Sequence, residues 1–196
     1  MNRLREFHDR WYRAGIEPLR RLDGLPPLAL RLYLVPVFWA AGTHKLAGID
    51  RTIEWFGNPD WGLGLPFPTL LAYVTAYTEV AGALLLLLGL ATRWVSVPLM
   101  ITMLVAIFAV HWEHGWAAIA DSSAPEVAVR LGDARAILRE YGNYAWLTEK
   151  GRFVILNNGI EFAVTYLIML FSLLFSGGGR YTSVDYYLSR LWPARY

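Results

Sequence analysis

The chain of 196 residues contains no cysteine. It therefore cannot form a dithiol–disulfide relay, a thiolate metal site or a cysteine-ligated iron–sulfur cluster. Charged residues are also scarce, at 17% against about 25% in soluble domains, whereas 56% of the residues are hydrophobic. The net charge is only +2, and no basic run carries interleaved aromatic residues in the manner of a groove that binds a nucleic-acid strand. These features argue against a nucleic-acid-binding protein.

The apolar residues are concentrated in four long runs. They occupy residues 25–47, 67–89, 94–112 and 153–176. A helix rises about 1.5 Å per residue, so each run is long enough to cross the hydrocarbon core of a bilayer, which is about 30 Å thick. Nine Trp and eleven Tyr fit aromatic belts at the two membrane interfaces. The sequence predicts one all-α domain over residues 1–196, a polytopic four-helix transmembrane bundle that contacts the lipid bilayer.

The segments outside these runs differ in character. Residues 1–24 are rich in arginine with apolar residues between, a pattern typical of an interfacial amphipathic helix or of a partly ordered tail. Residues 48–66 are dense in Gly, Pro and Trp and predict a loop at the interface. Residues 125–141 carry apolar side chains at helical spacing and predict a helix lying on the membrane surface.

Charge asymmetry predicts the topology. Six arginines lie in residues 1–24 and three in the tail after residue 176, whereas the first loop contains only Arg51. By the positive-inside rule both termini are expected in the cytoplasm, with the first and third loops outside. Residues 1–23 are charged and lack an apolar core, so they do not resemble a signal peptide.

The second apolar run contains one charged residue, Glu79, near its middle. A carboxylate at that depth costs about 2.5 kcal/mol or more on insertion scales, so it is expected to face the bundle interior and to have a partner. Small and polar residues share its helix face, namely Ala72, Thr75, Gly82 and Ala83. The sequence predicts an ion pair of Lys45 with either Glu79 or Glu161. Arg31, near the start of the first span, is expected to extend towards the headgroups.

Four antiparallel spans bring several polar residues to one end of the bundle. This set consists of His44, Lys45, His111, Glu113, His114, Asn157, Asn158 and Glu161, with Glu79 deeper. Such an arrangement suits proton delivery or a polar head group. We therefore predict Lys45, Glu79 and Glu161 as catalytic residues, and His44 and Asn158 as cofactor-binding residues. The alternative is that the ion pairs only hold the helices in register.

His111 and His114 lie at positions i and i+3, so both could bind one metal ion. With His44, Met100 and Met103 they suggest a copper or haem ligand set. The alternative is that the histidines anchor the helix at the interface and the methionines fill the core. The glycine run 177–179 similarly allows two interpretations, a backbone concavity for an anion or the simple end of a helix.

Several short motifs in order resemble the DoxX/DoxD family of small four-helix bacterial membrane proteins. They are Gly42-Thr43-His44-Lys45-Leu46, Thr78-Glu79, Gly89-Leu90-Ala91-Thr92-Arg93 and Gly177-Gly178-Gly179-Arg180-Tyr181-Thr182-Ser183-Val184-Asp185. The resemblance covers about residues 28–187 and marks Lys45, Glu79, Arg93 and Asp185. It implies a location in the bacterial inner membrane and adds Arg93 to the predicted cofactor-binding residues. Residues 55–66 look like a sub-branch associated with copper-binding modified peptides.

Three functions remain open at this point. The family includes subunits assigned to thiosulfate:quinone oxidoreductase, which implies an accessory redox subunit with a quinone as cofactor and a membrane or periplasmic partner protein. Because the chain lacks cysteine, its electrons would have to be carried by the quinone or the partner. The second function is a non-enzymatic membrane module that handles copper or a copper-binding peptide. The third is a proton-coupled carrier, which would need a homo-oligomer because four spans are few for a transport path.

Overall fold

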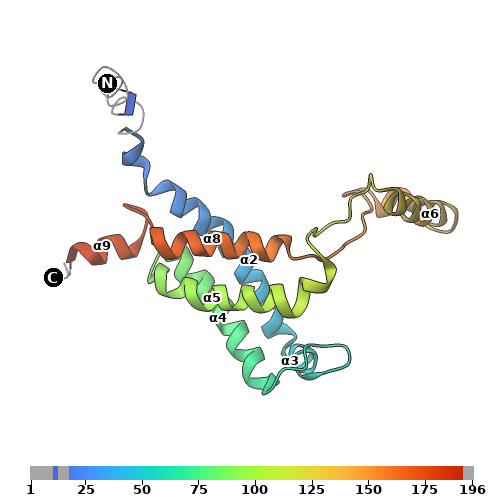
Figure 1. Cartoon of the computed structure of the whole chain (residues 1–196), viewed down its shortest axis with the longest axis horizontal. Helices are drawn as coiled ribbons and strands as arrows, with labels where there is room; N and C mark the ends of the chain where they lie inside the picture. The colour runs from blue at the N-terminus through green and yellow to red at the C-terminus, as the bar shows by residue number, and fades with distance from the viewer. Residues whose placement is uncertain (1–10, 13–17, 192–196) are drawn as a thin grey trace, which may run out of the picture. The chain divides into compact units, whose positions relative to one another are not determined.

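The computed structural model describes residues 11–12 and 18–191, and its regular elements there are helices with one isolated bridge, Ile119 to Leu156. The helices are α2 (Leu25–Ala47), α3 (Ile49–Gly57), α4 (Pro68–Leu88), α5 (Thr92–Val105), α6 (Pro125–Tyr141), α7 (Tyr144–Leu147), α8 (Glu161–Ser176) and α9 (Val184–Leu191) (Figure 1). Short helical turns cover Pro18–Leu22, Ala106–His111 and Trp112–His114. The predicted all-α fold is confirmed. Most of the predicted helix 1–24 lies outside the described residues.

The chain divides into two compact units. Unit 1 contains residues 1–103 and 166–196, and unit 2 contains residues 104–165. The boundaries cut through α5 and α8, and each unit is described by itself.

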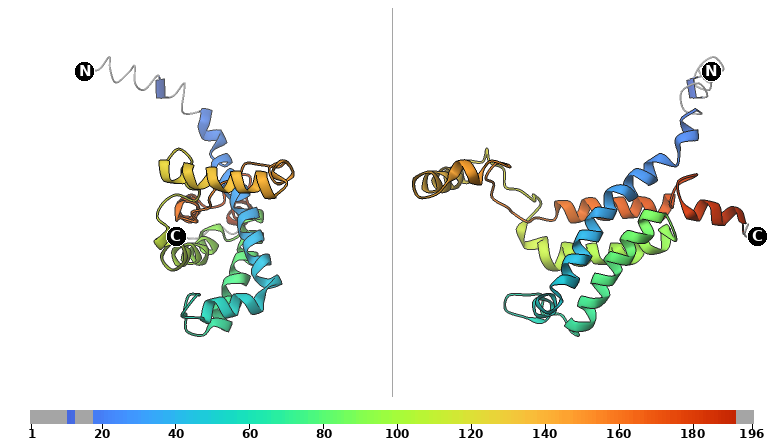
Figure 2. Two further views of the ribbon diagram at one scale, coloured as in Figure 1. Left: turned by 90° about the vertical axis from the view of Figure 1, so that its right-hand side faces the viewer. Right: turned by 180° about the vertical axis from the view of Figure 1, so that it is seen from behind.

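Four helices build the core of unit 1. Its buried residues are Leu34 and Phe38 of α2, Ala83 and Leu86 of α4, Val95, Leu99 and Met103 of α5, and Leu170 and Leu173 of α8. Helices α2 and α4 lie side by side, with α3 against α4 (Figure 2). Glycines permit this close packing: a β-carbon at Gly42 would lie 2.9 Å from the Ala76 carbonyl oxygen of α4. The predicted stripe of small residues on α4 is thus confirmed as its buried face.

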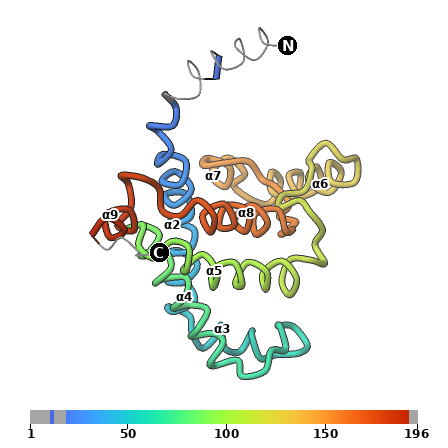
Figure 3. The backbone as a smooth tube through the Cα atoms, turned by 60° about the vertical axis from the view of Figure 1, so that its left-hand side comes forward, coloured from blue at the N-terminus to red at the C-terminus, as the bar shows by residue number. Residues whose placement is uncertain are grey.

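The first loop is not irregular, contrary to the prediction for residues 48–66. Its first half forms α3, a helix with one apolar face on which Phe56 is buried. Its second half turns back on α3: the backbone N–H of Leu63 donates to the Trp55 carbonyl oxygen at 2.9 Å, and that of Leu65 donates to the Phe56 carbonyl oxygen at 2.7 Å. Figure 3 shows α3 and this returning segment as one small hairpin beside α4. The Gly and Pro content of the whole segment concealed the helical period of its first nine residues.

In unit 2 the fourth predicted span is shorter than expected. Residues 153–160 are not helical, and α8 begins at Glu161. The segment pairs with residues 115–120 through bonds such as Asn157 N to Ala118 O at 2.9 Å and Ala120 N to Ile155 O at 3.0 Å. Asn158 adopts φ +60, and a β-carbon at Gly159 would lie 2.4 Å from the Ala117 carbonyl oxygen. Backbone pairing therefore replaces the helix here.

The predicted amphipathic helix at 125–141 is confirmed as α6, with identical bounds. Its predicted apolar face contains Leu131, which is buried with 1% of its surface exposed. Three helical segments are long and apolar enough to cross a membrane, Leu19–Ala47, Pro68–Leu88 and Thr92–His114, and α8 is a shorter apolar helix of 16 residues. The protein is therefore an all-α membrane protein.

Candidate functional site

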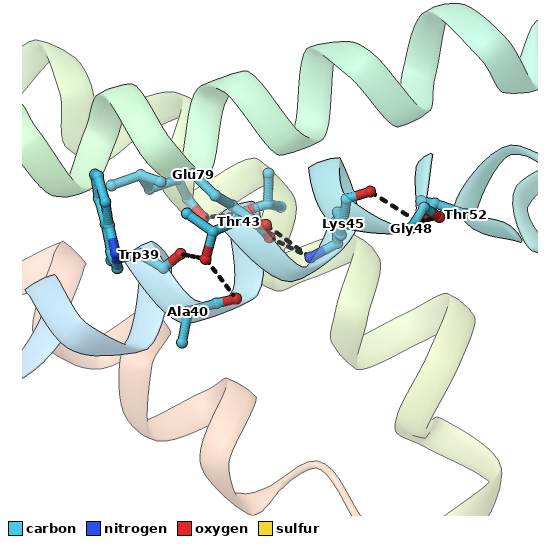
Figure 4. A network of polar contacts seen from close by, with 9 residues as sticks. Trp39, Ala40, Thr43, Lys45, Gly48, Thr52 and Glu79 are labelled. Atoms are coloured by element: carbon cyan, nitrogen blue, oxygen red, sulfur yellow. Dashed lines mark hydrogen bonds and ion pairs between the residues drawn. The ribbon is translucent and has the colours of Figure 1, made fainter. Parts of the chain in front are cut away.

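A lysine and a glutamate from two neighbouring spans form a two-pronged ion pair in unit 1. Lys45 Nζ of α2 donates to Glu79 Oε1 at 2.9 Å and to Oε2 at 2.7 Å (Figure 4). The Glu79 side chain is 4% exposed and that of Lys45 is 23% exposed. Of the two ion pairs predicted for Lys45, the structure contains the one with Glu79. The acid is enclosed, whereas the lysine side chain remains partly accessible.

Local helix geometry positions both groups. Lys45 lies in the last turn of α2, where the carbonyl ends of the helix favour a cation. Thr52 Oγ1 of α3 donates to the carbonyl oxygens of Gly48 at 3.1 Å and Lys45 at 3.4 Å, so α3 binds the end of α2 directly. Glu79 lies on the buried face of α4, beside the point where Gly42 allows the two helices to approach. The ion pair is therefore held by backbone that is itself tightly packed.

The predicted residues of unit 2 are held mainly by backbone. Glu161 Oε2 accepts from the Ala118 backbone N–H at 3.0 Å. His111 Nδ1 lies 2.8 Å from the Asn158 carbonyl oxygen, and because a carbonyl only accepts, Nδ1 carries the proton in this contact. These bonds tie the end of the third span to the segment before α8. Their structural role is clear, whereas their predicted catalytic and cofactor roles stay predictions.

The predicted metal-binding pair does not occupy one face of an α-helix. His111 ends a π-helical segment and His114 ends a 3₁₀ turn, so the α-helical i, i+3 spacing does not apply. Among the described residues there is no group of three or more His, Asp or Glu side chains that could hold a metal ion. A copper or haem site at His111 and His114 stays a prediction.

The predicted cofactor-binding residues His44 and Arg93 do not lie together. His44 is exposed beside Lys45 near the end of α2, whereas Arg93 follows the turn at Gly89, which contacts Arg31 near the start of α2. Fourteen residues separate Arg31 from Lys45, about 21 Å along a helix. Arg93 instead lines a cavity of about 600 Å³ beside the glycine run 177–179. The cofactor roles predicted for His44 and for Arg93 stay predictions.

The position of the Arg31 side chain differs from the one that the sequence predicted. Arg31 is fully buried rather than extended towards the headgroups. Its Nη1 donates to the Leu86 carbonyl oxygen at 3.0 Å, and its Nη2 donates to that of Thr182 at 2.8 Å. The burial of Arg31 could have been predicted from its helical spacing, because it shares one face of α2 with Leu34 and Phe38, which are buried. The arginine thus binds the carbonyl end of α4 and the segment before α9.

Asp185, which the family resemblance marked, completes this end of unit 1. Its two carboxylate oxygens accept from the backbone N–H groups of Ala91 at 2.7 Å and Thr92 at 2.9 Å. It therefore caps the start of α5 rather than its own helix, α9, whose start is capped by Ser183 Oγ. Arg31 and Asp185 together hold the turn between α4 and α5.

Comparison with known proteins gives two curated relatives. "Putative oxidoreductase CatD" of Bacillus subtilis (strain 168) is 39% identical over 83 residues, which is 42% of this chain and 58% of that protein. "Inner membrane protein YphA" of Escherichia coli (strain K12) is 31% identical over 100 residues, which is 51% of this chain and 67% of that protein. The match to CatD thus spans little more than half of that protein's length. No solved structure gives a significant match.

The family comparison covers the helices that carry the ion pair. The profile of the DoxX family matches residues 27–112, which include α2, α3, α4, α5 and both Lys45 and Glu79. Together with the similarity to YphA along two thirds of that protein, this match agrees with the motifs and the helical architecture. The chain belongs to the DoxX family.

Proposed function

We propose that this DoxX-family membrane protein is an accessory subunit of a quinone-linked redox system, and that Lys45 and Glu79 form its proton and ligand site. The observation that carries the proposal is the two-pronged Lys45–Glu79 pair between two apolar helices. Ionisable groups inside membrane spans are costly, and they commonly mark ion or proton pathways. The similarity to a protein named as an oxidoreductase supports a redox role.

The ion pair fits the needs of a quinone head group. A quinone carbonyl oxygen accepts hydrogen bonds, and an ammonium group has three N–H donors. Two contacts of Lys45 Nζ go to Glu79, which leaves one donor, and 23% of the lysine side chain is accessible. Lys45 would therefore bind the head group directly, while the enclosed Glu79 would hold the amine in place.

The chemistry divides between this chain and a partner. A bound quinone would accept two electrons and two protons to become a quinol. Because the chain has no cysteine, a partner oxidoreductase is needed to deliver the electrons. Lys45 would donate one proton to the nearby oxygen and become a neutral amine, whose reprotonation the Glu79 carboxylate beside it favours. The replacement proton and the second proton of the quinol would both come from water that reaches the partly accessible lysine side chain.

The experiment uses the full chain purified in mild detergent and reconstituted into lipid nanodiscs. Solvent extraction is expected to recover quinone with the protein, and added decylubiquinone is expected to raise the unfolding temperature. The decisive variant is the double change Lys45→Met and Glu79→Leu, which removes both charges and leaves neither stranded. It should fold and bind decylubiquinone at least tenfold more weakly.

Controls separate a ligand site from a purely structural pair. Arg130→Gln removes one partner of the exposed Arg130–Glu126 pair on α6 and should leave quinone binding unchanged. Absence of extractable quinone together with no thermal shift would reject the quinone proposal. If the double variant bound decylubiquinone as well as the unchanged protein does, the pair would serve only to align α2 and α4.

A further inference from the structure

Unit 1 contains a cavity at the end opposite to the Lys45–Glu79 pair. It measures about 600 Å³, within the range of about 300–1,000 Å³ typical of ligand pockets. Its walls come from the start of α2, the turn before α5, the glycine run after α8, and α9. These segments meet where α4 and α8 end and α5 begins, and the exposed Trp94 is one of the lining residues. The cavity thus lies where two apolar helices end and a third begins.

The charges around the cavity leave one cation without an acid. Asp185 is occupied by the backbone N–H groups of Ala91 and Thr92. Asp23 pairs with Arg180 at 3.3 Å, a contact that raises the pKa of the Arg180 guanidinium. Within the part of the chain that the structure describes, Arg93 has no ion pair or hydrogen bond. The cavity therefore offers an arginine that is available to an anion.

The glycine run brings backbone rather than side chains to the cavity wall. A β-carbon at Gly177, where φ is +74, would lie 3.2 Å from Nε of Arg93. A β-carbon at Gly178 would lie 2.6 Å from Cβ of Ser183. Larger residues would displace Arg93 or separate the run from the start of α9. The glycines thus set both the width of the cavity and the position of its free arginine.

The hydroxyl groups around the cavity point to a second donor. Ser176, Ser183 and Ser189 donate to backbone carbonyl oxygens, so their protons are already used. Tyr186 is one of the residues that line the same cavity, and its hydroxyl is buried without a hydrogen-bond partner among the described residues. A buried hydroxyl without a partner is costly, and it gains most when a ligand accepts its proton.

We propose that this cavity binds a phosphate group, with Arg93 and the Tyr186 hydroxyl as its donors. Arginine presents paired N–H donors that match phosphate oxygens, and the tyrosine hydroxyl adds a neutral donor from another helix. The phosphate belongs to an anionic lipid headgroup or is free phosphate, and the two sources share this chemistry. The site is separate from the Lys45–Glu79 pair and needs no quinone.

The test measures binding to the full chain after delipidation in mild detergent. The probes are dihexanoyl phosphatidylglycerol, dihexanoyl phosphatidylcholine and inorganic phosphate, each followed by the shift in unfolding temperature. Arg93→Gln should weaken phosphatidylglycerol binding about tenfold, and Tyr186→Phe about threefold. Arg93→Lys should recover part of the loss, and Arg130→Gln on α6 is the matched control for the removal of an exposed arginine.

The outcomes identify the source of the phosphate. Binding of phosphatidylglycerol alone, weakened by both variants, supports a lipid headgroup site. Equal binding of inorganic phosphate with the same dependence on Arg93 supports a free-phosphate site. The proposal is overturned if neither phosphatidylglycerol nor inorganic phosphate binds, or if their binding is unchanged in Arg93→Gln and in Tyr186→Phe.

Discussion

Helix α2 carries two cations in its apolar stretch, and they are satisfied in different ways. Arg31 is fully buried and binds backbone carbonyl oxygens. Asp185 interacts with it through charge alone, without a hydrogen bond. Lys45 is partly accessible and binds the side chain of Glu79 through both oxygens. The carbonyl partners of Arg31 cannot be removed by mutation, but the partner of Lys45 can. Arg31 therefore has a structural role, because it links the end of α4 to the segment before α9. Lys45 and Glu79 instead form a side-chain pair that could rearrange around a ligand.

Substitution of Lys45 is expected to have the largest effect on stability and tests the difference between the two cations. Lys45→Met would strand the enclosed Glu79 charge and should lower the free energy of unfolding by about 3–5 kcal/mol. Adding Glu79→Leu should restore stability to within about 1 kcal/mol of the unchanged protein, because apolar residues can replace a buried pair. Denaturant titration in detergent micelles measures both variants. A double variant as unstable as the single one would show that the charges themselves hold the fold.

Arg31→Met should cause the next largest loss of stability. No second substitution can restore it, because the partners of Arg31 are backbone carbonyl groups. Arg31→Met leaves the carbonyl groups of Leu86 and Thr182 without their donor, and we expect a loss of about 3 kcal/mol. Arg31→Lys should lose about half as much, since one ammonium group cannot reach both carbonyl groups as the guanidinium does. The same denaturant titration measures both variants. Unchanged stability in Arg31→Met would contradict the structural role of Arg31.

Gly89→Ala tests the turn that Arg31 binds. Gly89 adopts φ +64, and a β-carbon there would lie 2.1 Å from Nη1 of Arg31. A left-handed non-glycine residue costs about 1–2 kcal/mol, and the displaced arginine adds to it, so we expect a loss of about 2 kcal/mol. In an Arg31→Met background this loss should fall to the backbone cost and the contact of the new β-carbon with Cβ of Ser183, which would lie 2.6 Å away. Equal losses in both backgrounds would mean that the glycine does not act through the arginine.

Asp185→Asn should have the smallest effect of the four. The amide keeps one acceptor for the backbone N–H groups of Ala91 and Thr92 but loses the charge that strengthens both bonds. We expect a loss of about 1 kcal/mol, the usual size of a helix-capping effect. Asp133→Asn, on α6, is a control for loss of an exposed acid. A loss in Asp185→Asn no larger than in this control would contradict the capping role.

The sequence predicted the Lys45–Glu79 pair for a reason that operates within each helix. An acid in the middle of an apolar run must find a partner, and a lysine on the buried face of the preceding run was within reach. Arg31 was misjudged because an arginine near the end of a span satisfies the same rule by extending to the headgroups. Only the fold brings the Thr182 carbonyl group, 151 residues away, to its guanidinium.

The failures at residues 49–57 and 153–160 share a physical cause. Residues 49–57 precede a stretch rich in glycine and proline, and residues 153–160 join four apolar residues to Asn157, Asn158 and Gly159. Each local pattern is compatible with more than one backbone conformation. Packing of α3 on α4 selected a helix in the first segment, and pairing with residues 115–120 selected extended backbone in the second. Both choices depend on partners distant from the local pattern.

The sequence by itself determined that this is an all-helical membrane protein of the DoxX family, and it predicted that Lys45 forms an ion pair with Glu79 or Glu161. Hydrophobic run length, helical periodicity and the cost of a charge in lipid act locally, so they can be evaluated along the chain. Only the tertiary structure decided that the buried Arg31 binds the carbonyl groups of two other segments, that Asp185 caps a distant helix, and that Arg93 and Tyr186 line one cavity. Those arrangements arise from backbone groups and glycines brought together by folding, and no local pattern encodes them.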